Sequence, residues 1–102
     1  MHHIQILLPL NDDEGRRFPA QAFERLTGEL TEKFGGATSF TRTPAEGRWK
    51  NGQTTEHDDI AVIEVMTETV EREWWADLHQ RLEHEFNQDE VVIRSHQADG
   101  YA

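Results

Sequence analysis

The chain has 102 residues, of which 20 are acidic and 10 are basic, and its formal net charge is -10. This length suits one domain, and we expect residues 1–102 to form it, with 97–102 as a frayed tail. The acidic excess would repel phosphate backbones and anionic lipid, so neither nucleic acid nor a membrane is an expected partner. The sequence has no cysteine, which excludes disulfides and thiolate catalysis and fits a cytoplasmic setting.

The first predicted elements are a strand and a helix. Apolar residues at every second position (Ile4, Ile6 and Leu8) predict a strand that ends near Pro9. This apolar run is too short for a signal peptide or a membrane span. Apolar residues at helical spacing then predict a helix that begins at Pro19 and runs to Phe34. Gly35-Gly36 is expected to end it, because glycine adopts the left-handed cap without a steric penalty.

The middle of the chain predicts two strands with a hairpin between them. Thr38 to Thr43 is rich in β-branched and aromatic residues and predicts the second strand. Asn51-Gly52 predicts a type I′ turn with Trp49 beside it. The third strand is expected from Asp59 to Met66 and is mainly apolar on both faces. This pattern is typical of a central strand that is covered on both sides.

The last predicted elements are a helix from Val70 to Phe86 and a strand from Glu90 to His96. An apolar residue at every fourth position of the helix assigns Trp74 to the core and Trp75 to its flank. The element order predicts an α+β, ferredoxin-like βαββαβ sandwich, a four-stranded antiparallel sheet with both helices on one face. Within it, strands one and three are expected to be parallel neighbours in the centre, with strands two and four at the edges.

The alternation of side chains along each strand predicts which residues share a face of the sheet. The helix-covered face is expected to hold Ile4, Ile6, Leu8, Ala61, Ile63, Val65, Val91 and Ile93. The helix-free face is expected to hold Gln5, Leu7, Ile60, Val62, Glu64, Met66, Val92 and Arg94. Because a monomer rarely exposes so large an apolar surface, we expect a homodimer in which two sheets pack face to face. An edge-strand dimer is the second choice.

Gln5, Glu64 and Arg94 are the polar side chains of the helix-free face, and with Trp49 and His57 they are the candidate ligand-binding residues. In one interpretation Arg94 holds a substrate oxyanion while Glu64 moves a proton. In the other, the three form a polar network that fixes the register of the dimer. Trp49 would stack on a ligand or pack at the dimer seam. We assign no catalytic residue and expect no metal or cofactor, because the histidine spacing matches no metal-binding motif.

A local resemblance rests on Phe34-Gly35-Gly36-Ala37-Thr38, Gly47-Arg48-Trp49, Asn51-Gly52 and Asp58-Asp59. This pattern is similar to uncharacterised bacterial domains in which phenylalanine–glycine–glycine–x–threonine precedes glycine–x–tryptophan. By element order, the chain resembles the dimeric α+β barrel group of ferredoxin-like proteins, which includes cofactor-independent oxygenases, muconolactone isomerase-like enzymes and haem-processing proteins. Neither resemblance transfers a functional residue to this chain.

Three functional interpretations follow. The first is a small, soluble, homodimeric α+β domain that holds a small apolar ligand between its sheet and the partner. The second is a metal-independent enzyme, oxygenase- or isomerase-like, that acts on a small oxygen-bearing organic molecule. The third is an assembly or adaptor module. Whether the protein is an enzyme stays open at this point.

Overall fold

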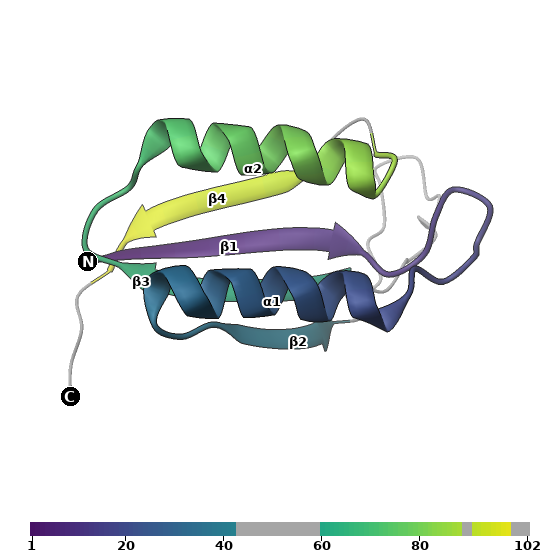
Figure 1. The fold of residues 1–102 in the computed structure, drawn as a ribbon, viewed down its shortest axis with the longest axis horizontal. Coiled ribbons are helices and arrows are strands. Elements are labelled where there is room, and N and C mark those ends of the chain that lie inside the picture. Colours follow the sequence, from purple (N-terminus) through teal and green to yellow (C-terminus); the bar gives the residue numbers. More distant parts are fainter. Residues whose placement is uncertain (43–59, 89–90, 99–102) are drawn as a thin grey trace, which may run out of the picture.

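The computed structural model describes residues 1–42, 60–88 and 91–98. The elements follow the predicted order and are β1 (His2–Pro9), α1 (Ala20–Phe34), β2 (Thr38–Arg42), β3 (Ile60–Thr67), α2 (Arg72–Glu85) and β4 (Val92–Gln97). Figure 1 shows both helices on the same face of one sheet. The α+β, ferredoxin-like arrangement is therefore confirmed. The predicted hairpin at Asn51-Gly52 lies outside the described residues.

The strands form one sheet in the order β2-β3-β1-β4, and every neighbouring pair is antiparallel. The central position of β1 and β3 is as predicted, but their expected parallel direction is wrong. Helix α1 carries the chain back along the sheet, so that β2 starts at the same end as β1 (Figure 1). A strand that lies between these two and is antiparallel to β2 must also be antiparallel to β1.

Local chemistry accounts for where α1 begins and ends. Pro19 has an extended backbone and precedes the first turn, so α1 begins at Ala20, one residue later than predicted. Gly35 ends it, as predicted, with a φ of 83°, and its N–H donates to the carbonyl of Thr31 at 2.8 Å. The predicted frayed tail is partly wrong, because Gln97 belongs to β4 and the N–H of Ala98 donates to the carbonyl of Met1 at 2.8 Å. Residues 99–102 lie outside the described part of the chain.

The core lies between the sheet and the two helices. It contains Ile4, Ile6, Leu8, Leu10, Ala22, Leu26, Leu30, Ala61, Ile63, Val65, Trp75, Leu78, Leu82, Phe86 and Val91. Seven of the eight residues predicted for the helix-covered face are among them, and Ile93 packs against them at the margin on the edge strand β4.

The two tryptophans of α2 exchange the roles that the sequence predicted for them. Trp75 is 7% exposed and belongs to the core, whereas Trp74 is partly buried and packs against it. An α-helix has 3.6 residues per turn, so a strict four-residue repeat advances about 40° around the helix at each step. Counted back from Leu78 and Leu82, the step to Trp75 is three residues, which keeps Trp75 on the buried face.

Candidate functional site

The pairing register arranges the helix-free face in rows that run across the strands. Directly opposite residues of an antiparallel pair share a face, so each row is a set of neighbours. We call Thr38, Glu64, Gln5 and Arg94 the polar row, and Phe40, Val62, Leu7 and Val92 the apolar row. At the other side of the polar row lie Met66, His3 and His96, which we call the histidine row.

A continuous chain of hydrogen bonds follows the polar row. Arg94 Nε donates to Gln5 Oε1 at 3.0 Å, and Gln5 Nε2 donates to Glu64 Oε1 at 3.1 Å. The amide of Gln5 therefore connects the guanidinium on β4 with the carboxylate on β3. The sequence placed Gln5 between these two groups, and the register and the two bonds agree with that placement.

His3 and His96 extend this chain, and the sequence interpretation missed both. His3 Nε2 lies 2.7 Å from Glu64 Oε2, and His3 Nδ1 lies 3.3 Å from His96 Nε2. The two imidazoles meet edge to face, with ring centroids 4.8 Å apart. Both histidines have the same strand parity as Gln5 and Arg94, and this signal was available in the sequence.

The hydrogen-bond chemistry assigns a direction to this chain. An ionised carboxylate only accepts, so the Nε2 of His3 must donate to Glu64. In a neutral His3 the Nδ1 is then an acceptor, and the Nε2–H of His96 donates a hydrogen bond to it. The Nδ1 of His96 is left as the basic atom at the end of the chain. This is the order of groups that orients an imidazole for proton transfer in many active sites.

The carboxyl group of Glu64 is tuned by these neighbours. Burial by itself would raise the pKa of Glu64, but hydrogen bonds from Gln5 and His3, together with the attraction of His3 and His96 where these are protonated, outweigh burial and lower that pKa. The side chain of Glu64 is 26% exposed, so solvent still reaches it. Glu64 is consequently a stable anion at neutral pH, although apolar residues lie in the next row.

A depression of about 490 Å³ opens beside His3 and Glu64, in the middle of this chain of hydrogen bonds. His3 and Glu64 form its polar part, and the other lining residues are Phe34, Gly35, Gly36, Ala37, Thr38, Val65 and Met66. The turn from α1 to β2 therefore forms one wall. Small-molecule sites in proteins have volumes of roughly 300–1,000 Å³, and this depression is within that range.

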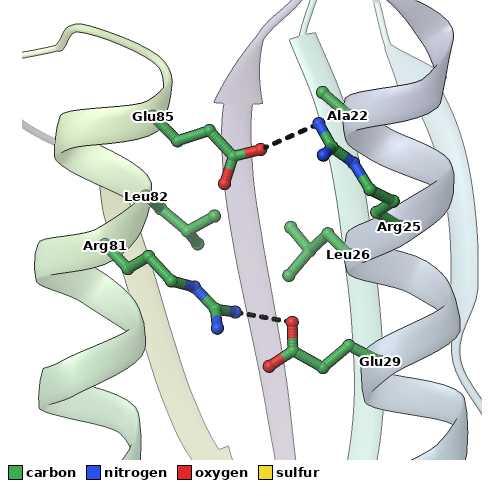
Figure 2. Close-up of a pocket in the computed structure, with 7 residues that line it drawn as sticks. All are labelled: Ala22, Arg25, Leu26, Glu29, Arg81, Leu82 and Glu85. Atoms are coloured by element: carbon green, nitrogen blue, oxygen red, sulfur yellow. Dashed lines mark hydrogen bonds and ion pairs between the residues drawn. The ribbon is translucent and has the colours of Figure 1, made fainter.

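A second hollow, between the helices on the opposite side of the sheet, has a structural explanation. It measures about 210 Å³ and is crossed by two ion pairs, Arg25–Glu85 at 3.6 Å and Arg81–Glu29 at 2.6 Å (Figure 2). Leu26 and Leu82 lie beneath them. Each charged group already has an opposite charge as its partner. We interpret this groove as a contact that holds α1 to α2, and it is not our candidate site.

Two other predicted site residues, Trp49 and His57, lie outside the described residues, so their role stays a prediction. Among the described residues there is no group of three or more acidic or histidine side chains arranged to hold a metal ion. The helices of the described ranges are also too short or too polar to cross a membrane.

No family model and no curated protein matches this chain. Two solved structures of phage SAM lyase are similar to it in fold. The first, in complex with S-methyl-5'-thioadenosine, has a TM-score of 0.60 and 16% identity over 94% of this chain and 80% of that chain. The second, in the apo state, has a TM-score of 0.53 and 17% identity over 99% of this chain and 92% of that chain. At such identities the likeness shows a shared fold.

Proposed function

We propose that this protein binds a small organic molecule on the helix-free face of its sheet, next to His3 and Glu64, with a second copy of the chain closing the site. The observation that carries this proposal is the hydrogen-bonded chain from Arg94 to His96, whose middle members His3 and Glu64 line a depression of about 490 Å³. Charged groups ordered in this way beside apolar side chains are typical of sites that orient a ligand.

The chemistry of the face defines the class of ligand. The Glu64 carboxylate favours a cationic group or a hydrogen-bond donor, and the apolar side chains of Phe34 and Met66 in the same depression favour a flat apolar body. S-methyl-5'-thioadenosine, which the phage SAM lyase binds, combines a planar base with hydroxyl donors. SAM itself adds a sulfonium cation, which an ionised carboxylate attracts. These two compounds are therefore the first probes.

Metal-independent enzyme activity is the second candidate, and the geometry of His3 favours it. The 2.7 Å contact between His3 Nε2 and Glu64 Oε2 fixes the tautomer of His3. His3 accepts a hydrogen bond from His96 and donates one to Glu64. A proton that His96 Nδ1 takes from a bound molecule would therefore be stabilised, through His3, by the carboxylate. Glu64 would then support the base, and Arg94 would hold an oxyanion of the substrate.

Calorimetric titration of the purified protein with each probe tests the binding proposal. We expect Glu64→Gln to weaken binding by about 10- to 100-fold, the value of one charge-assisted hydrogen bond. Asp77→Asn, an equivalent change at an exposed position of α2, is expected to leave binding unchanged. Equal affinity in the wild type and Glu64→Gln would reject this site, and no binding of either probe at millimolar concentration would reject the ligand class.

The enzyme candidate has its own readout. SAM is incubated with the protein, and the products are followed by chromatography and mass spectrometry. We expect any turnover to fall at least about 100-fold in His3→Ala and His96→Ala, because general-base catalysis contributes 10²–10⁴-fold. Binding without turnover would retain the ligand site and reject the enzyme.

A further inference from the structure

The polar row carries opposite charges on the two sides of β1. Glu64 lies on β3 and Arg94 on β4, so that two strand spacings, about 10 Å, separate their backbones. The bond from Arg94 to Gln5 uses one of the three guanidinium nitrogens. Glu64 is an anion that solvent still reaches, and Arg94 is exposed. A second molecule that approaches this face therefore meets a negative flank and a positive flank.

The rows on this face also differ in polarity. In the apolar row, Phe40 is 41% and Val92 is 42% exposed, and Met66 in the histidine row is 43% exposed. Exposed apolar side chains at both ends of one row are stabilised when another apolar surface covers them. The covering surface must therefore match the rows, with apolar groups against the apolar row and opposite charges against the two flanks.

A second copy of the same face meets this requirement in one orientation only. Two copies packed face to face are related by a two-fold axis that lies between the sheets. If the axis runs along β1, each row faces its own copy with the two flanks exchanged, so that β3 lies over the partner's β4. An axis that runs across the strands reverses the order of the rows. If it passes over the polar row, Glu64 faces the same carboxylate of the partner. If it passes between the polar and apolar rows, the polar row faces the apolar row.

We infer that two copies of this chain associate through their helix-free faces about a two-fold axis along β1, with Glu64 of each copy paired to the partner's Arg94. Sheets packed face to face lie about 10 Å apart, a gap that long glutamate and arginine side chains from opposite sheets together span. The inference rests on the proposed function, which places a second copy on this face, and it adds the orientation and the paired residues. The depression beside His3 stays at the edge of the contact.

Charge reversal tests this orientation. In Glu64→Arg the like charges of two arginines face each other twice, and in Arg94→Glu two glutamates do so. We expect the wild type to sediment at twice the 11.9 kDa chain mass, and each variant to dimerise at least about tenfold more weakly. An equimolar mixture of the two variants restores both opposite-charge contacts, so we expect dimers to form again. Asp77→Arg and Arg72→Glu, which make the same charge changes on α2, are expected to leave the dimer intact.

Each contrary result overturns the inference. A wild-type monomer or trimer at micromolar concentration does so, and so does a mixture of the two variants that stays monomeric. If charge reversal unfolds the chain, as circular dichroism would show, Glu64→Gln and Arg94→Gln replace it, and a double-mutant cycle must give a favourable coupling in the dimerisation constant. A monomer that still binds a probe would reject this interface and retain the ligand site. A dimer that binds no probe would retain this interface and reject the ligand site.

Discussion

The adjacent tryptophans of α2 allow a quantitative test of the core. Trp75 is 7% exposed, and its ring stacks on Phe34 with centroids 5.4 Å apart and planes 11° from parallel. Trp74 is partly exposed, meets Phe34 edge to face, and lies 4.7 Å from the Nζ of Lys33. Truncation of a buried tryptophan costs about 3–5 kcal/mol, so we expect this loss for Trp75→Ala. Trp74→Ala removes two aromatic pairs, with Phe34 and with Trp75, and a cation–π contact, together about 1.5–4 kcal/mol.

The free energy of unfolding is measured by urea titration with far-ultraviolet circular dichroism at one protein concentration, since dimerisation makes stability concentration-dependent. If Trp75→Ala does not fold, Trp75→Phe replaces it. That variant also removes the Trp75 indole N–H, which is buried without a hydrogen-bond partner among the described residues, so we expect it to cost less than about 2 kcal/mol. A loss for Trp74→Ala equal to or larger than that for Trp75→Ala would refute the assignment of Trp75 to the core.

Three further predictions concern charges and glycines. The pKa of Glu64 is lowered from 4.5 in the folded state, so the ionised carboxylate stabilises the fold above about pH 4.5, and this contribution is lost as the pH falls through the lowered value. The stability advantage of the wild type over Glu64→Gln, measured by urea midpoints, should therefore shrink in acid. An advantage that grows in acid would contradict this. A double-mutant cycle on Arg81 and Glu29 should give a coupling of about 0.2–1 kcal/mol that salt reduces, because the pair is about half exposed; a salt-independent coupling would argue against an ion pair. Gly28→Ala should stabilise α1 by about 0.5–1 kcal/mol, since an added Cβ meets nothing within 4 Å. Gly35→Ala should destabilise it by about 1 kcal/mol, because the φ of Gly35 is 83°. Thermal unfolding midpoints that shift in the same direction for both variants would contradict this.

The element order and the face of each strand residue were predictable because both depend on local periodicity. Alternation along β1 and β3 assigned Ile6 and Ile63 to the helix side and Gln5 and Glu64 to the other. The end of α1 was predictable because glycine alone adopts the conformation of Gly35 without strain. The relative direction of β1 and β3 was predicted wrongly as parallel, although a crossover through α1 followed by an antiparallel β2–β3 pair requires β1 and β3 to be antiparallel.

The candidate site was predictable only in part, for the same reason. Gln5, Glu64 and Arg94 were identified by their polarity among apolar neighbours, which is visible within each strand. His3 and His96 were missed, although they complete the hydrogen-bonded chain. Strand parity places both histidines on this face, but it does not give the cross-strand register that brings His3 against Glu64 and His96.

The amino-acid sequence by itself determined the elements, the two faces of the sheet and the surplus of apolar surface on one of them, because side-chain periodicity is a property of each segment. The tertiary structure decided which segments meet and at what offset. Ladder hydrogen bonds pair His3 with Met66 and Gln5 with Glu64 and Arg94, and a shift of one residue would turn the side chains of β1 to the opposite face. The cross-strand register, and with it the site, exists only once the strands are paired.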